Sequence, residues 1–556
     1  MTEQPDSPEL GVRGAVIAAP FQRPIERRSV LDRAHQGDIE GAFGRVATHD
    51  AGPRGSVGTR LATLVVVMGP GIVVMTGDNE AGSLSIYGQA GQNYGVSLVW
   101  LLVPLAGMLF LNQEMVARLG AVTGAGHARL IYERFGRRWG AFALTDLMML
   151  SLLTIVTEFI GVDLAASYLG IDPYLAVLLV AAALLAATAT GSFRRWERVG
   201  YAFVALNVLV IPLAFLSRPE PLALAQGLVP GVSGGLKVSS VLFVVALAGA
   251  TVTPWQLFFH QSNVVDKRIT GRWLAYERAD TLIGTLVFVF VAIAIVATCA
   301  FAFDGTAFHG GFVDAGGVAR GLATHLGRPA GVLFALVLLN GSILGALVVT
   351  LGASYAIGDV FGVKHSLHRR WSDAPGFYGI YAALVTVAAA VVLVPGAPLG
   401  LVTTIVQALA GVLLPSALVF LVLLCNDREV LGPWTNPSWL NAIAVTSIGI
   451  LLVLSALLTF ETLLPGVGVS SVALVLTGAL AAVLVVLAGT VGWRSGRTSE
   501  RISFWSRASW TMPPLETLGP PTGSRGRELG LIVLRAYLTL AAVALVATTV
   551  RSTLAR

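Results

Sequence analysis

Charged residues are scarce in this chain of 556 residues, of which only 12% are Asp, Glu, Lys or Arg. Soluble domains carry about 25% of such residues. This shortage excludes a water-soluble fold of this size, because its surface could not be covered with so few charges. Apolar residues make up 55% of the chain, and the relevant unit is the run of about 20 apolar residues that crosses a bilayer as one helix. The sequence therefore predicts an all-α, polytopic membrane protein.

Several sequence motifs of disulfide-bonded, metal-binding, nucleotide-binding and catalytic sites are also absent. Cysteine occurs twice, as Cys299 and Cys425, and both residues lie in apolar stretches, which excludes a disulfide framework and a Cys-x-x-Cys metal site. No Walker A loop, HExxH or Gly-x-Ser-x-Gly pattern occurs, so we expect neither ATP as a partner nor enzymatic activity. The net charge of +6 is spread between apolar segments without a long basic run, so nucleic acid is not an expected partner.

Twelve apolar runs are long enough to span a membrane, and a thirteenth candidate begins near Gly530. Lipid offers the backbone no water to bond with, so we expect these runs to be helices. Residues 1–56 are polar and Arg-rich and lack the apolar core of a signal peptide. The runs begin near Leu61, Ser97, Ala141, Tyr174, Tyr201, Val238, Leu282, Ala330, Phe377, Leu401, Leu440 and Val469.

Basic residues alternate between the loops and so indicate the orientation of the chain. Arginines and lysines gather in the first tail and after the second, fourth, sixth, eighth and twelfth runs, whereas the loops 170–173 and 395–398 contain none. Cytoplasmic loops carry the excess of Lys and Arg. We therefore expect a multi-pass protein of the cell (inner) membrane with a cytoplasmic N-terminus.

The first run is interrupted by polar residues in its middle. An apolar stretch leads directly into Gly77, Asp78 and Glu80, passes Gly82 and then continues. Acids inside a span are rare and usually face a cavity or a partner, and the flanking glycines allow the backbone to unwind. This pattern predicts a broken helix that carries two carboxylates.

The sixth run is interrupted by Pro254. Proline removes an amide donor and clashes with the preceding turn, so the carbonyls around Ala250 and Thr251 need another partner, and a cation is one such partner. Proline and glycine kinks often only assist packing, which is the alternative interpretation of either break alone. Two interrupted helices five spans apart, however, are typical of a transporter site near the bilayer midplane.

At these residues the chain resembles the NRAMP (natural resistance-associated macrophage protein) family of metal-ion transporters, from about Gly69 to Gly432. The shared segments are Gly69-Pro70-Gly71, Gln89-Ala90-Gly91, Tyr94-Gly95, Ala117-Arg118-Leu119-Gly120, Val122-Thr123-Gly124, Glu158-Phe159-Ile160-Gly161, Gly249-Ala250-Thr251-Val252, Pro254 and His260. The resemblance implies a LeuT-type fold with two inverted five-helix repeats, helices 1–5 and 6–10, followed by additional C-terminal helices.

With this resemblance, the expected organisation of the chain has five parts. They are a disordered cytoplasmic tail over 1–56, a transporter core of ten spans over 57–425, two further spans over 426–495, a cytoplasmic linker over 496–528, and a thirteenth span or interfacial helix over 529–556.

The first broken helix departs from the family signature Asp-Pro-Gly-Asn. The resemblance places Glu80 where the family has its metal-binding aspartate and Ser83 where it has the asparagine. Asp78 is an additional acid just before this motif. We expect Asp78 and Glu80 to be charged ligands and Ser83 to be a neutral oxygen ligand or a contact to the water shell of an ion.

The second broken helix departs from the family signature Met-Pro-His-Asn. Thr253 and Gln256 replace the methionine and the asparagine, and Ala250 falls where the family contributes a backbone carbonyl. Gln407, in the tenth run, resembles a family glutamine that approaches the ion. The expected site therefore consists of oxygen donors.

The loss of the methionine bears on the choice of ion. A thioether favours softer transition metals, whereas carboxylate, carbonyl, hydroxyl and water suit Mg²⁺, Ca²⁺ and Mn²⁺. Mg²⁺ keeps several waters and uses one or two carboxylates, which Asp78 and Glu80 could supply. The site is closer to the NRAMP-related magnesium-transporting branch that lacks this methionine. Mg²⁺ or Mn²⁺ is the expected cargo, Al³⁺ stays open because the superfamily includes an aluminium-transporting branch, and no resident cofactor is expected.

Proton coupling is expected to be weak or absent. In the proton-coupled members of the family that the chain resembles, helix 3 carries the motif Asp-x-x-Glu. Here Glu158 matches the glutamate, but Ile155 stands where the aspartate would be. Trp255 replaces the histidine of the helix 6 signature. A proton relay needs titratable groups within hydrogen-bond reach, and two usual members are missing. Glu158 and His260 remain candidates for an ion or proton path, with structural roles as the alternative.

Three other functions stay open on the sequence alone. The first is a proton-coupled Mn²⁺/Fe²⁺ symporter whose metal ligands lie at other sequence positions than in the family. The second is a transporter of amino acids or other organic solutes, since helix ends at an unwound segment can bind a carboxylate. The third is a membrane receptor that binds a metal without moving it. The expected partners are the metal ion and the lipid bilayer, and the sequence leaves the oligomeric state open, with a monomer compatible with it.

Overall fold

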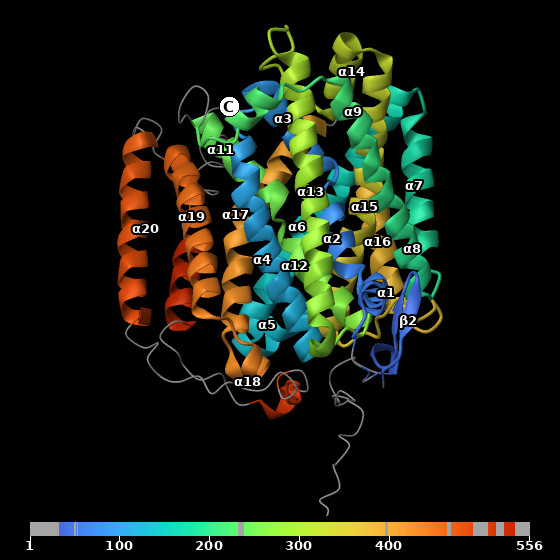
Figure 1. Ribbon diagram of the computed structural model, residues 1–556, viewed down its shortest axis with the longest axis vertical. Coiled ribbons are helices and arrows are strands. Elements are labelled where there is room, and N and C mark those ends of the chain that lie inside the picture. The colour runs from blue at the N-terminus through green and yellow to red at the C-terminus, as the bar shows by residue number, and fades with distance from the viewer. Residues whose placement is uncertain are drawn as a thin grey trace, which may run out of the picture.

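The computed structural model describes residues 33–48, 50, 52, 54–231, 238–394, 399–463, 469–492, 507, 510–518 and 527–539. Long helices run roughly parallel through the molecule (Figure 1). One end of the bundle carries β2, α1, α5 and α18, and the opposite end carries α3 and α14 (Figure 1). By length and composition, nine of the described helices can cross a membrane, or ten if the bent pair α1–α2 counts as one span.

The first five predicted spans correspond to helices or chains of helices, linked by short segments. In chain order they are α1 (Val57–Val67) with α2 (Pro70–Gly77) and α3 (Ala81–Tyr94), then α4 (Val99–Thr123), α6 (Arg137–Leu169), α7 (Pro173–Thr188), and α8 (Phe193–Leu206) with η2 (Asn207–Leu209) and α9 (Val210–Leu216). Between them lies α5 (His127–Phe135), and α10 (Pro221–Gln226) follows α9.

The next five predicted spans repeat this arrangement, again beginning with a broken helix. They are α11 (Val238–Thr251) with α12 (Pro254–Asp266), then η3 (Gly271–Trp273) with α13 (Leu274–Phe303), α15 (Arg328–Phe361), α16 (Pro375–Val392) and α17 (Leu399–Cys425), with α14 (Ala315–Leu326) between α13 and α15. The order of broken and continuous helices agrees with the expected LeuT-type fold of two five-helix repeats.

Short elements and two long helices complete the described chain. Before α1 lie η1 (Arg33–His35), β1 (Ile39–Gly41) and β2 (Gly44–Val46), and after α17 come α18 (Arg428–Leu431), η4 (Gly432–Trp434), α19 (Ser438–Leu463), α20 (Val469–Gly492) and η5 (Leu515–Thr517). Residues 527–539 are helical, which is the described part of the thirteenth candidate. At 16 residues α7 is shorter than the other candidates, so a full crossing by α7 stays a prediction.

Two details differ from the sequence-based expectation. Residues 1–32 lie outside the described residues, but residues 33–48 of the expected disordered tail contain η1, β1 and β2. The first span is also broken twice, because α1 and α2 meet at an angle of 53° before the polar interruption is reached. Gly69, with φ of +148°, and the following Pro70 cause this earlier bend, since the residue before a proline avoids the helical region.

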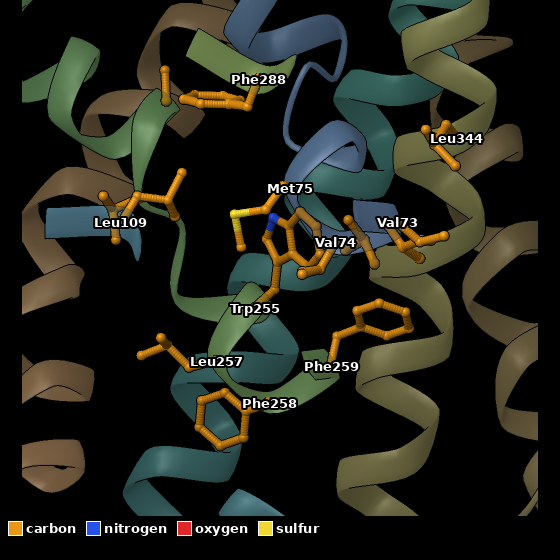
Figure 2. Packing of buried hydrophobic residues seen from close by; sticks show 14 of the residues in the cluster. Val73, Val74, Met75, Leu109, Trp255, Leu257, Phe258, Phe259, Phe288 and Leu344 are labelled. Carbon is orange, nitrogen blue, oxygen red and sulfur yellow. The ribbon is translucent and has the colours of Figure 1, made fainter. Parts of the chain in front are cut away.

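The broken helices lie inside the bundle and are covered by the continuous ones. α13 packs against α2 and α3, α12 packs against α4 and α15, and α11 packs against α17. The apolar packing around this centre includes Trp255 of α12, Val74 and Met75 of α2, and Phe259, all of which are buried (Figure 2). This packing holds the two breaks beside each other.

Candidate cation-binding site

The two breaks meet at a hydrogen bond between Asp78 and Thr253. α2 ends at Gly77 and α3 begins at Ala81, so Asp78, Asn79 and Glu80 form the interruption. On the other side, α12 begins at Pro254 with Thr253 as its extended preceding residue. Thr253 Oγ1 donates to Asp78 Oδ1 over 2.9 Å, and both side chains are buried. The interrupted stretches predicted by the sequence therefore face each other.

The carbonyl of Ala250 lines the same junction. In a continuous helix it would accept from the amide of residue 254, but that residue is Pro254, which has no N–H. Instead, the Ser83 hydroxyl donates to this carbonyl over 2.7 Å and the Tyr87 hydroxyl donates over 3.1 Å. Ser83 and Ala250 are thus brought together as expected, although here they bond to each other.

Glu80 lies between α17 and α6. Gln407 Nε2 donates to Glu80 Oε1 over 2.8 Å, and the carboxyl groups of Glu80 and Glu158 lie near enough for their charges to interact. The backbone N–H of Ala81, at the start of α3, donates to Glu158 Oε2 over 3.1 Å. A helix N-terminus favours negative charge, and two carboxyl groups in contact cannot both ionise readily. A cation beside Glu80 and Glu158 would reduce the repulsion between their negative charges.

Glycine allows this close approach on the α15 side. A Cβ on Gly345 would lie 2.8 Å from each carboxyl oxygen of Glu158, and one on Gly341 would lie 2.2 Å from the carbonyl oxygen of Asn79. Real side-chain carbons do not come so near. Gly341 and Gly345 therefore create the space in which the unwound segment and Glu158 lie.

Buried oxygens at this junction have no donor. Among the described residues, the oxygens at this junction without a hydrogen-bond partner are Asp78 Oδ2, Asn79 Oδ1, Glu80 Oε2, Glu158 Oε1 and Gln407 Oε1. A buried acceptor without a partner is costly, and such groups normally signal water or an ion. Within the described chain no three or more His, Cys, Asp or Glu residues form a group that could hold a metal ion. A cation here would therefore rely on few acids together with neutral oxygens and its own water.

Gln256 is buried near this junction, and a neighbouring side chain bonds to its amide oxygen. Its Oε1 accepts from Gln113 Nε2 over 3.1 Å, so this amide oxygen is already engaged. Gln113 Oε1 is 2.9 Å from His260 Nδ1, and His260 Nε2 is 2.9 Å from Glu277 Oε1. In this arrangement Gln256 is the first member of a buried polar chain, and its role as an oxygen ligand or water-shell contact stays a prediction.

Three polar residues of this region were not predicted from the sequence: Asn79, Gln113 and Glu277. Asn79 was passed over between two acids, although an amide inside an apolar run is a usable signal. Gln113 and Glu277 lie close to basic residues at the ends of their runs, so both were indistinguishable from residues at the membrane surface. His260 was identified, and the structure places it between these two side chains.

The positions that depart from the family's proton relay are apolar here. Ile155 is fully buried on α6, three residues before Glu158. The ring of Trp255 lies against the α2 side chains Val74 and Met75 in Figure 2, and its centre is 6.4 Å from that of Phe259. Neither position supplies a group that titrates near neutral pH.

The fold and the facing breaks define a LeuT-type membrane transporter rather than an enzyme. The chain belongs to the family described as natural resistance-associated macrophage protein-like (Nramp), which it matches over residues 71–461. Proteins of this family carry metal ions as cargo and use no cofactor.

Curated relatives cover most of this match. The chain is 30% identical over 417 residues to the divalent metal cation transporter MntH of Verminephrobacter eiseniae, covering 72% of this chain and 90% of the relative. It is 27% identical over 450 residues to MntH of Burkholderia ambifaria, covering 77% and 95%.

Solved structures share the fold. A manganese transporter of Eremococcus coleocola, bound to an aromatic bis-isothiourea compound, superposes with a TM-score of 0.59 at 21% identity, covering 80% of this chain and 96% of the other. A mutant of that transporter gives a TM-score of 0.62 at 19% identity, covering 82% and 97%.

Proposed function

We propose that this protein imports a divalent metal cation, Mg²⁺ or Mn²⁺, by alternating access at the junction of the two breaks. The observation that carries the proposal is the set of buried oxygens without donors around Asp78 and Glu80. A cation with part of its water shell would satisfy them together. Relatives named as divalent metal cation transporters support this class of cargo over an organic solute.

The preference for a hard cation rests on Thr253. Its hydroxyl is part of the junction through the bond to Asp78, at the position where the resemblance implies a thioether. Oxygen donors favour Mg²⁺ and Mn²⁺, and a thioether favours softer metals. Asp78 and Glu80 provide the one or two carboxylates that Mg²⁺ uses while it keeps several waters.

We further propose that the membrane potential drives uptake with weak or no proton coupling. Moving one charge through 100 mV releases about 2.3 kcal/mol, so a divalent cation gains about 4.6 kcal/mol. Buried Ile155 and Trp255 leave the Glu80–Glu158 pair without the usual relay groups. The pair would then bind and release any proton locally.

A proton-coupled symporter is the second candidate, because Glu80 and Glu158 place two carboxyl groups close together at the junction, where one of them could carry a proton. If binding of the cation expelled this proton to the opposite side, uptake would be coupled. A pH-sensitive dye inside liposomes separates the two cases. We expect metal uptake without matching acidification; acidification in proportion to metal uptake would establish the symporter instead.

Uptake by reconstituted protein tests the ligand assignment. We expect Asp78→Ala and Glu80→Ala to lose at least about tenfold in Mg²⁺ and Mn²⁺ uptake, since each removes a charged ligand. Asp163→Ala, on α6 and half-buried, is the matched control and should keep the parental rate. Parental uptake by both site variants would show that the ion binds elsewhere.

A further inference from the structure

The segment before α1 forms a strap across the end of the bundle. This strap, residues 34–46, contains the hairpin of β1 and β2, paired as Ile39 with Val46 and Gly41 with Gly44. Ile39, Ala42 and Val46 are buried. An isolated two-stranded hairpin is marginal in water, so its order depends on the surface beneath it. Figure 1 shows β2 beside α1 at the end that also carries α5 and α18.

One face of α8 holds the tip of the strap. Arg194 Nε donates to the Gly41 carbonyl and Arg198 Nε donates to the Ala42 carbonyl, each over 3.0 Å. Glu197 accepts from the Ala42 N–H. The Phe43 ring lies 5.2 Å from the ring of Tyr201. Residues spaced by three and four positions share one face of a helix, so this face of α8 fits the hairpin tip.

The base of the strap is held at the end of α12. Arg268 donates to the Ala34 carbonyl over 2.9 Å and to the Asp38 carbonyl over 3.0 Å. His35 Nε2 lies 3.8 Å from Asp266 Oδ1. The strap therefore bridges α8 and α12, which belong to different five-helix repeats.

Glu197 connects the strap to the start of α2. It pairs with Lys267, whose ammonium group donates to the Met68 carbonyl at the bend between α1 and α2. From α13, Asp280 accepts from the amides of Gly69, Gly71 and Ile72 over 2.9, 2.7 and 3.1 Å. α2 is thus fastened at its first residues, and its last residues lead into Asp78.

We propose that the strap is a built-in lock on transport. While Ala42 and the arginines of α8 hold it in place, it fixes Glu197 and Lys267 against the start of α2, and α2 cannot move to open the site toward this end. Each transport cycle then requires the strap to detach, so its affinity for α8 sets the turnover rate. This inference rests on the proposed alternating access at the junction.

Weakening the strap tests the lock. In the full chain, Arg194→Gln with Arg198→Gln removes two bonds from charged donors, each of which contributes modestly. We expect Mn²⁺ uptake into liposomes to rise about three- to tenfold. Arg195→Gln, an exposed residue of α8 without a strap contact among the described residues, should keep the parental rate. An unchanged or reduced rate in the double variant that folds and reconstitutes like the parent would overturn the proposal.

Crosslinking the strap to α8 is the complementary test, because it fixes the strap in place instead of weakening it. Its outcome does not depend on whether the arginine variants fold. Phe43→Cys with Tyr201→Cys, bridged by a bifunctional thiol reagent that a reductant can cleave, should stop uptake and regain it on reduction. The native Cys299 and Cys425 are fully buried, and each single variant treated with the reagent is the control. A bridged protein that transports at the parental rate would overturn the lock.

Labelling separates the lock from the identity of the cargo. Thr76→Cys places a thiol on buried α2, and a membrane-impermeant maleimide should label it faster when Arg194 and Arg198 are replaced. If neither Mg²⁺ nor Mn²⁺ is transported but labelling still depends on the strap, the proposed cargo is wrong and the lock stands. Labelling that is independent of the strap would refute the lock.

Discussion

Thr253 shows how one side chain can change the chemistry of a site. Its hydroxyl bonds to Asp78 at the junction of the breaks, at the position where related proteins are expected to present sulfur. Because the rest of the junction offers carboxylate, hydroxyl, amide and carbonyl oxygens, the character of position 253 decides whether the site contains any soft donor.

Thr253→Met should therefore shift selectivity. We expect the ratio of Cd²⁺ or Fe²⁺ uptake to Mg²⁺ uptake to rise about tenfold, since a soft thioether is added and a hydroxyl is lost. Thr298→Met on α13 is the control, because the native hydroxyl bonds to the Ala294 carbonyl of its own helix and to no other described residue. A ratio that stays at the parental value would remove softness as the basis of selectivity.

Gly345 is a second position at which a small change, the addition of one methyl group, should reduce transport. Gly345→Ala places a methyl group 2.8 Å from the Glu158 carboxyl oxygens, so Glu158 must shift away from the Ala81 amide and from Glu80. We expect cation uptake to fall about tenfold and the free energy of unfolding to fall by about 1–3 kcal/mol, the usual cost of a small overpacking change. Gly379→Ala on α16, where a Cβ meets nothing within 4 Å, should transport normally. Equal rates in both variants would show that Glu158 does not need its present position.

The sequence predicts which residues form the site better than it predicts the contacts between them. Asp78 and Glu80 were predicted because acids interrupt an apolar run, and Ser83 and Thr253 were predicted from the family resemblance. The structure joins Asp78 to Thr253 and Ser83 to Ala250. The bond between Gln113 and Gln256 joins residues 143 positions apart. The local sequence pattern does not show which distant spans pack together. The hydrogen bond from Gln113 to the amide oxygen of Gln256 could therefore not be predicted.

At the scale of elements, the break of α11 and α12 has a simple cause. Pro254 deprives the Ala250 carbonyl of its helical donor, and Ser83 and Tyr87 donate to it instead. The break is thus held open from α3, and the two broken helices depend on each other.

Pro254→Ala should tend to restore a continuous helix. The new amide would compete with Ser83 for the Ala250 carbonyl, and a helix interior gains about 3 kcal/mol when proline is removed. We expect the variant to fold and to lose most cation uptake. Pro104→Ala in α4, a helix that continues through its proline, is the control. Parental uptake by Pro254→Ala would show that the break is not needed for transport.

Elements whose cause is local were predictable, and the others were not. Pro254 and the glycines beside Asp78 and Glu80 predict the two breaks from local sequence alone. The bend at Gly69 was missed because the short α1 looked like a continuation of the same apolar run. The strap was missed because a polar, Arg-rich tail gives no sign of the surface on which it docks; its order comes from α8 and α12.

At the scale of the whole molecule, one end of the bundle carries a buried histidine that lies between an acid of α15 and the strap. In the loop after α15, His365 Nε2 lies 3.1 Å from Asp359 Oδ1, His365 Nδ1 donates to the Val363 carbonyl, and the His35 ring of the strap is 5.4 Å away. Burial favours neutral His365, but the Asp359 carboxylate and the Val363 carbonyl outweigh it, so the pKa of His365 lies above its usual value. Asp266 adds to this attraction.

The stability of this end should therefore depend on pH. A raised pKa in the folded state contributes stability below the unfolded value of about 6.5, and this contribution is lost as pH rises through the folded pKa. The melting temperature of the parent minus that of His365→Gln should thus be largest near pH 6 and shrink at higher pH. Thermal unfolding in detergent measures it, and a constant difference across this range would contradict the ion pair.

The most direct measurement is Mn²⁺ binding to purified protein by electron paramagnetic resonance, with Mg²⁺ as competitor. In the parent we expect Mn²⁺ to bind at one site and Mg²⁺ to displace it, whereas Asp78→Asn with Glu80→Gln should bind neither ion measurably and Asp163→Asn should bind as the parent does. Undiminished Mn²⁺ binding by the double variant would contradict a cation site built from the two facing breaks.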